Sequence, residues 1–203
     1  MEINQNEIEL SGKKLFYRSY EKGDRENFIL LHDSKTDSSS WESIDALRKI
    51  GQWGYNVYAV DYPGFGKSEY NGKYNFGSNP SKGSLFIKDF SELLRLDTLY
   101  IIGPSVSAGS ALKALIDLKN VKASIIIGGL GIDYILGELN KIEKPILILW
   151  GSGDNVVPIS HGMKYHDLIA SSKFIKIDKA GHCVQVEKPN MFFNSLKKFL
   201  DEI

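Results

Sequence analysis

Several features that would point to a particular compartment or partner are missing from this sequence. The chain of 203 residues has a single cysteine, so it can form no internal disulfide, which is typical of a reducing compartment. Its 25 basic and 25 acidic residues leave a formal net charge of +0. Because a protein that binds a polyanion needs an excess of Lys and Arg, we expect no nucleic-acid partner.

Long hydrophobic runs are also missing. The apolar stretches have the length of strands, as in 146–150, and none is long enough to cross a bilayer. The first residues contain neither the basic nor the apolar segment of a signal peptide. We therefore expect a cytoplasmic protein with no membrane partner. The length fits a single domain over residues 1–203 with one sizeable core.

The order of the apolar segments predicts an α/β fold. Ser11-Gly12 is a turn signal, and it predicts a hairpin over 3–20. Strands are then expected at 28–32, 55–60, 99–102, 123–127, 145–150 and 174–177, and helices at 41–53, 85–94, after 105, at 160–169 and at 188–202. This alternation predicts a mostly parallel central sheet with helices on both faces. A loop over 69–82, rich in Gly, Asn, Ser and Tyr, is the best candidate for a mobile segment.

The stretch 101–109 contains the first candidate for catalysis. An apolar strand ends at Gly103, and a helical pattern begins directly after Ser105. Small residues at 103 and 107 would let a sharp turn close and push the hydroxyl of Ser105 out of the sheet. This is the pattern of a nucleophile elbow, G-x-S-x-G, although Ser107 stands where the pattern prefers glycine. In the alternative interpretation, Ser105 is only the N-cap of a helix.

Two further residues at predicted strand ends are of the types that activate a serine. Functional groups in parallel sheets gather beyond the carboxyl ends of the strands, and Asp154 and His182 follow two successive strands downstream of Ser105. The chain order Ser, Asp, His is that of the α/β-hydrolase triad. Asp133, after the strand at 123–127, stays open as the alternative acid.

Other chemistries fit the spacing less well. Gly66-Lys67-Ser68 is similar to the end of a phosphate-binding P-loop, but the first glycine of that motif falls at Asp61. His161 and His166 would lie about 140° apart around a helix, so they cannot face one metal ion. Cys183 has no second histidine placed to activate it, so we expect it to pack. We therefore expect neither a metal ion nor a cofactor.

Segments spread over nearly the whole chain resemble the α/β-hydrolase superfamily. They are 30–32, 61–68, 103–107, 151–154 with Pro158, and 181–182 with 187–189. The small size and the Pro-Ser-x-Ser elbow are most similar to its small lidless group, the CIB-like hydrolases, which was first named for binding a partner protein. Many superfamily members insert a cap between two of these strands, but 128–144 is too short for one. We therefore expect no cap domain and an open, shallow site.

The resemblance implies a role for each candidate residue. Ser105 would be the nucleophile, His182 the general base and later the acid, and Asp154 the group that orients the imidazole. The backbone N–H groups of Val106 and Ser34 would hold the oxyanion.

The surroundings of that oxyanion carry further expectations. Asp33 stands where the superfamily usually has glycine, and its carboxylate would oppose an oxyanion if it pointed inward. Candidate residues for the substrate walls are Ile132, Val156 and Phe65.

These observations predict a serine hydrolase, esterase-like, that cleaves small acyl esters or related acyl bonds through an acyl-enzyme. The substrate would be a small acyl compound or an acylated carrier or protein. Two alternatives stay open. One is a protein-binding module on a hydrolase fold with weak or vestigial activity. The other is an acyltransferase that passes the acyl group to a thiol or an amine.

Overall fold

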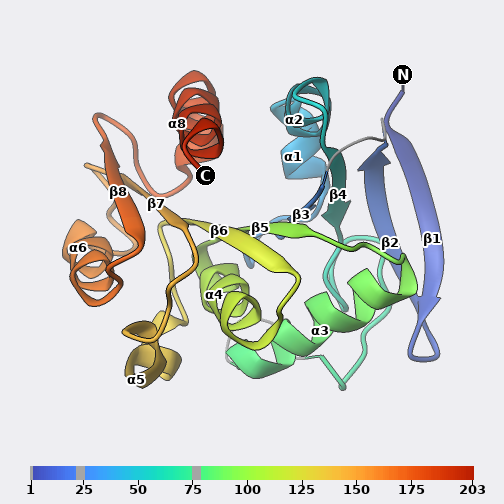
Figure 1. Ribbon diagram of the computed structural model, residues 1–203. Coiled ribbons are helices and arrows are strands. Elements are labelled where there is room, and N and C mark those ends of the chain that lie inside the picture. The colour runs from blue at the N-terminus through green and yellow to red at the C-terminus, as the bar shows by residue number, and fades with distance from the viewer. Residues whose placement is uncertain (1, 22–25, 75–78) are drawn as a thin grey trace.

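The computed structural model describes residues 2–21, 26–74 and 79–203, which build one eight-stranded sheet (Figure 1). Its strand order is β1-β2-β4-β3-β5-β6-β7-β8. The strands are β1 (Asn4–Leu10), β2 (Lys13–Tyr20), β3 (Asn27–Leu30), β4 (Asn56–Val60), β5 (Leu99–Pro104), β6 (Val121–Ile127), β7 (Ile146–Gly151) and β8 (Ser172–Ile177). All pairs from β4 to β8 are parallel, whereas β2 pairs antiparallel with β1 and β4. The mostly parallel sheet predicted from the alternation is confirmed.

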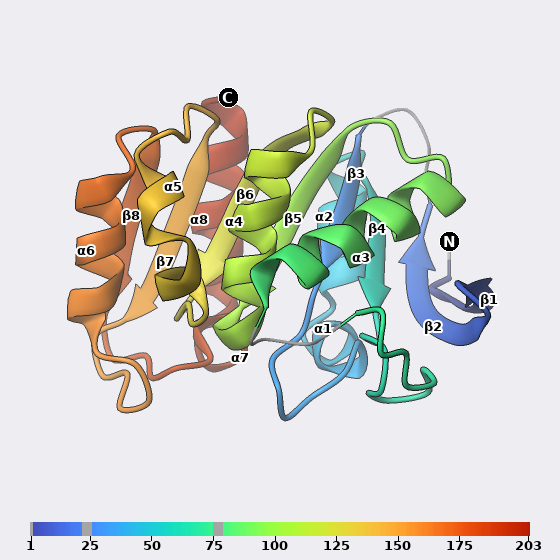
Figure 2. The ribbon, with the colours of Figure 1, turned by 90° about the horizontal axis from the view of Figure 1, so that it is seen from below.

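Helices cover both faces of the sheet, as predicted. One face carries α3 (Pro80–Leu93), α4 (Ala108–Asp117), α5 (Leu136–Leu139) and α6 (Ile159–Leu168), which Figure 2 shows in front of the strands. The opposite face carries α1 (Ser39–Ser43), α2 (Ala46–Gln52) and α8 (Pro189–Asp201) (Figure 1). The α/β-hydrolase fold expected from the sequence follows from this arrangement.

The central strands are buried on both faces, which explains why they are continuously apolar. In β5, Ile101 packs into the core beneath α3 and α4, and its neighbours Tyr100 and Ile102 pack into the core beneath α1, α2 and α8. Neither Ile101 nor Ile102 exposes any surface. Successive side chains of a strand point to opposite sides, so one apolar run stabilises two helical layers.

The first two strands form the predicted hairpin. Its turn consists of Ser11, with φ 52°, and Gly12, with φ 75°. Positive φ at both central residues is typical of the type I′ turns whose twist matches that of paired strands. The pairing of Leu10 with Lys13 closes the register.

Two helices differ from the prediction. α1 and α2 replace the single helix expected over 41–53, because Asp45 between them adopts the left-handed conformation, with φ 58°. α3 begins at Pro80, earlier than the expected 85, because Asn79 caps it by accepting a hydrogen bond from the Lys82 amide. The loop predicted over 69–82 is only partly described, since 75–78 lie outside the described residues.

The connection between β6 and β7 contains only two short helical segments, η2 (Ile132–Ile135) and α5. Residues 128–145 are all described and form no cap domain, as the length of this connection predicts. Within the described ranges, no helix combines the length and the apolar character needed to span a membrane.

Candidate active site

The turn after β5 presents Ser105 at the carboxyl edge of the sheet. Ser105 opens a short helical turn, η1 (Ser105–Ser107), and adopts φ 50°, a conformation that costs energy for any residue except glycine. The turn is tight: a Cβ on Gly103 would lie 2.6 Å from the Ser107 carbonyl oxygen and 2.8 Å from the Ala111 Cβ. A side chain at 103 would therefore force the turn open, as the sequence pattern indicates.

A continuous chain of hydrogen bonds joins the three residues expected to form the triad. The Nε2 atom of His182 lies 3.0 Å from the Oγ atom of Ser105. The Nδ1 atom of the same imidazole lies 2.8 Å from the Oδ2 atom of Asp154. The Asp154 side chain has no exposed surface, and that of His182 is 14% exposed. With the ring proton on Nδ1, Nε2 is free to accept the proton of the Ser105 hydroxyl.

The loop after β7 holds the carboxylate of Asp154 in place. Its second oxygen, Oδ1, accepts hydrogen bonds of 2.9 Å from the amides of Val156 and Val157. Asp133, the alternative acid, is placed elsewhere: it lies 3.6 Å from the Lys164 ammonium and 3.3 Å from the Tyr165 hydroxyl. The structure therefore brings Asp154, and not Asp133, to the imidazole.

One carboxylate accepts hydrogen bonds from the backbone amides on both sides of His182. Glu187, at the end of α7 (Val184–Glu187), accepts hydrogen bonds from the amides of Gly181, at 2.7 Å, and Cys183, at 3.0 Å. The ring itself is closely approached by Gly128, since a Cβ on Gly128 would lie 2.9 Å from Nδ1 of His182. The sequence pattern assigns no role to Glu187, and the signal that points to it is its place in the 187–189 segment that resembles the superfamily.

Val106 and Ser34, the residues whose amides are expected to bind an oxyanion, line the same pocket as Ser105. The amide of Val106 lies in the first turn of η1, where N–H groups have no acceptor within the helix. Ser34 belongs to the loop after β3. The Oδ1 atom of Asp33 accepts a hydrogen bond of 2.7 Å from the Lys35 amide, so this carboxylate is engaged by its own loop.

The pocket at Ser105 has a volume of about 380 Å³. Its walls come from the loop after β3, the elbow and the loops that follow β6, β7 and β8: Asp33, Ser34, Lys35, Thr36, Ser105, Val106, Leu130, Val156, His182 and Cys183. Val156, one of the three predicted wall residues, lines it and is 58% exposed.

The structure does not place the other two predicted wall residues in this pocket. Ile132 has no exposed surface and packs in the core beneath α4, because η2 turns it inward. Phe65 packs against the imidazole of His32, with ring centroids 5.2 Å apart, and does not line this pocket. Leu130, which sequence analysis did not single out, takes part in the wall instead.

Cys183 lines the pocket but is poorly suited to be a nucleophile. Burial raises the pKa of its thiol, and the negative charges of Asp33 and Glu187 raise that pKa further. A protonated thiol is a weak nucleophile. The group of the pocket best placed to attack a substrate is therefore the Ser105 hydroxyl.

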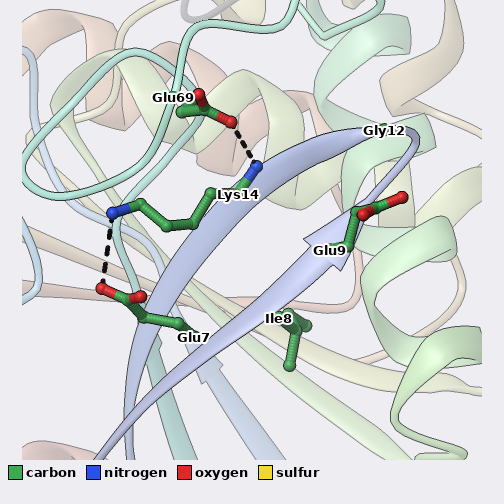
Figure 3. Close-up of a pocket in the computed structure, with 6 residues that line it drawn as sticks. All are labelled: Glu7, Ile8, Glu9, Gly12, Lys14 and Glu69. Atoms are coloured by element: carbon green, nitrogen blue, oxygen red, sulfur yellow. Dashed lines mark hydrogen bonds and ion pairs between the residues drawn. The ribbon is translucent and has the colours of Figure 1, made fainter.

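A second pocket, of about 310 Å³, lies on the edge hairpin and is lined by acidic side chains (Figure 3). The Lys14 ammonium lies 3.5 Å from Glu7 in it, and the Lys14 amide donates a 2.7 Å hydrogen bond to Glu69. It contains no nucleophile or histidine. Among the described residues, no group of three or more His, Cys, Asp or Glu side chains could hold a metal ion.

Comparison with known proteins agrees with this fold. The family model of the alpha/beta hydrolase fold matches residues 127–189. The "Putative protein-lysine deacylase ABHD14B" of Rattus norvegicus is 25% identical over 209 residues, which cover 100% of this chain and 98% of the relative. "Protein ABHD14A" of the same organism is 25% identical over 195 residues, covering 94% of this chain and 79% of the relative.

Solved structures show the same fold. The crystal structure of a "predicted CIB-like hydrolase" from Thermoplasma acidophilum superposes with a TM-score of 0.94 and 29% identity, with 100% of both chains covered. An esterase from Exiguobacterium antarcticum matches with a TM-score of 0.80 and 18% identity, over 96% of this chain and 98% of the esterase.

Proposed function

Because this chain is a member of the α/β-hydrolase superfamily, we propose that it is a serine hydrolase whose catalytic triad is Ser105, His182 and Asp154. The observation that carries the proposal is the chain of hydrogen bonds, of 3.0 Å and 2.8 Å, from the Ser105 hydroxyl through His182 to Asp154. A hydroxyl is a weak nucleophile until a base removes its proton, and this arrangement supplies that base.

The first half of the reaction forms an acyl-enzyme. Nε2 of His182 takes the proton of the Ser105 hydroxyl while Oγ attacks the acyl carbon, and the carbonyl oxygen becomes an oxyanion. Asp154 stabilises the imidazolium that results. When the intermediate collapses, His182 gives the same proton to the leaving alcohol or amine. In the second half, water attacks the acyl carbon with His182 again as base, and Ser105 regains its proton.

The amides of Val106 and Ser34 would stabilise the oxyanion in both halves. Donors already held in place at the developing charge need no rearrangement during the reaction. The left-handed backbone at Ser105, with φ 50°, supports this function, since strain of this kind is common at active sites.

The substrate we propose is a short acyl group carried by a larger molecule, through an ester or an amide bond. The described connection 128–145 forms no cap domain, and Val156 at the pocket wall is 58% exposed, so a bulky carrier can approach. A relative of similar length bears the name of a protein-lysine deacylase, which supports an acylated protein side chain as carrier. A pocket of about 380 Å³ suits a small acyl group better than a lipid chain.

Hydrolysis of a short-chain aryl ester tests the proposal. We expect Ser105→Ala to lower kcat by about 10³ or more, because the triad acts as a unit. Ser110→Ala is the matched control, since it removes a buried serine hydroxyl from the next turn of α4 without reaching the pocket. A fluorophosphonate probe should label the wild type and the control but not Ser105→Ala. Equal rates for Ser105→Ala and wild type would overturn the proposal, whereas a folded wild type that takes no label would favour a binding module on this fold.

A further inference from the structure

The loop after β3 is held by three hydrogen bonds to successive backbone carbonyls, each from a different side chain. The indole N–H of Trp41 donates to the Leu31 carbonyl at 2.7 Å. The hydroxyl of Ser107 donates to the His32 carbonyl. The Nδ1 atom of His32 lies 2.7 Å from the Asp33 carbonyl oxygen. Peptide groups in an ordinary surface loop can rotate, whereas these are fixed one after another.

The imidazole of His32 can donate only through Nδ1 at this position. Its Nε2 atom accepts a hydrogen bond of 3.0 Å from the Tyr62 amide, so the ring proton of the neutral form is on Nδ1. The side chain is 1% exposed, and burial lowers the pKa of the imidazole. His32 is therefore a neutral, directed donor to the Asp33 carbonyl.

This contact determines the direction of the Ser34 amide. The described chain contains no cis peptide bond, so the Asp33 carbonyl and the Ser34 N–H point in opposite directions from one plane. The carbonyl points at the buried His32 ring, and the N–H points the other way. Ser34 lines the pocket together with Ser105, so an N–H that points away from the buried ring can face the pocket.

Ser107 connects this loop to the nucleophile elbow. It lies two residues after Ser105, is 2% exposed, and occupies the position where G-x-S-x-G has glycine. A glycine there has no side chain and could not make this hydrogen bond to the His32 carbonyl. Resting on the proposed function, we propose that Ser107 is a positioning residue: through the His32 carbonyl it holds the loop so that the Ser34 amide faces the oxyanion formed at Ser105.

The expected size of the effect follows from this role. Removal of one oxyanion donor from other hydrolases lowers kcat by about 10²–10³. A donor that is still present but less well oriented retains part of its effect, so loss of the Ser107 hydroxyl should lower kcat by about 10-fold to 100-fold. KM should change little, because the donor acts on the charge that develops in the transition state.

The experiment compares Ser107→Ala and Ser107→Gly with Ser124→Ala. Ser124 is the matched control, because its buried hydroxyl also donates to a backbone carbonyl, that of Ala111 at 3.0 Å, and neither residue lines the pocket. The assays are hydrolysis of a short-chain aryl ester, the rate of fluorophosphonate labelling, and thermal unfolding. We expect both Ser107 variants to lose kcat and labelling rate in parallel, with KM within about twofold of wild type.

The control should lose a similar amount of thermal stability but keep its kcat. The acid limb of the pH profile should be the same in wild type and both Ser107 variants, since the triad itself is untouched. The proposal is overturned if the Ser107 variants keep kcat within about twofold, if Ser124→Ala loses as much, or if the acid limb moves. Failure of the proposed function would instead show as a wild type that neither hydrolyses the ester nor takes the label.

Discussion

Both oxygens of the Asp154 carboxylate accept hydrogen bonds. One oxygen faces His182, and the other accepts two amide hydrogen bonds from its own loop. An acceptor held in this way orients the imidazole without side-chain motion. The neighbouring candidate, Asp133, lies on the surface against Lys164.

This difference predicts opposite outcomes for two equivalent substitutions. Asp154→Asn should lower kcat by about 10³ or more, because an amide can neither stabilise the imidazolium nor hold the correct tautomer. Asp133→Asn makes the same chemical change at a half-exposed site and should leave kcat within about twofold of wild type. Steady-state hydrolysis of an aryl ester measures both. A large loss in Asp133→Asn with none in Asp154→Asn would reverse the assignment.

The buried imidazole of His32 predicts how stability depends on pH. Burial lowers its pKa in the folded state, whereas in the unfolded chain the pKa is about 6.5. The unfolded chain therefore binds a proton more readily, so the free energy of unfolding should fall as pH drops below about 6.5. Protonation of Nε2 would also break the hydrogen bond from the Tyr62 amide.

Chemical denaturation between pH 7 and pH 5 measures this effect. We expect His32→Asn to flatten the pH dependence of the free energy of unfolding. His166→Asn, which replaces an exposed imidazole, is the control and should keep the slope of the wild type. If both variants kept that slope, His32 would not be the group responsible.

At the scale of elements, the site is assembled from the turns that follow parallel strands. Ser105 follows β5, Asp154 follows β7 and His182 follows β8. The turn after β6 supplies none of the three proposed triad residues, but it passes close to the imidazole. Gly128 in that turn has φ 55° and leaves no room for a Cβ beside Nδ1 of His182.

A methyl group at this turn should therefore disturb the imidazole. We expect Gly128→Ala to lower kcat at least about tenfold, because small displacements of a catalytic group are costly. Its positive φ should add a loss of about 1 kcal/mol in the free energy of unfolding. Gly137→Ala is the control: a Cβ there meets nothing within 4 Å, and α5 is helical, so activity should stay unchanged. Wild-type kcat in Gly128→Ala would contradict the predicted contact.

At the scale of the whole molecule, a partly buried charge network joins the antiparallel edge of the sheet to the loops around the site. Arg18 on β2 lies 2.7 Å from Glu42 on α1 and 3.8 Å from Asp61, which follows β4. Asp61 is 1% exposed and also accepts hydrogen bonds from the Ser38 and Lys67 amides. The network thus anchors the end of the loop that carries Ser34.

Breaking this network should destabilise the whole fold. Arg18→Met leaves Asp61 buried without its cation and should lower the free energy of unfolding by about 3 kcal/mol. Arg48→Met removes an exposed pair with Asp45, in which both side chains are more than 40% exposed, and should cost at most about 1 kcal/mol. Urea denaturation measures both. Equal, small losses in the two variants would contradict a stabilising role for the buried network.

Patterns that are local in the chain predicted the elements well. The hairpin, the strands and the elbow follow from apolar period, turn residues and small side chains, all of which act between near neighbours. Local pattern missed the break at Asp45 and the early start of α3, where a single backbone conformation or a cap decides the boundary. It also assigned Ile132 and Phe65 to the pocket, because a few neighbouring residues do not show whether a side chain packs against elements that are distant in the chain.

By itself, the sequence determined the order of strands and helices, the missing cap, and the candidates Ser105, Asp154 and His182 at strand ends. Only the tertiary structure decided which carboxylate meets the imidazole, and which side chains fix the amide of Ser34. Those contacts join residues as far apart as Ser107 and His32, or His182 and Ser105. Chain spacing carries no information on such distances, because parallel pairing in the sheet, and not the backbone between them, brings their strand ends together.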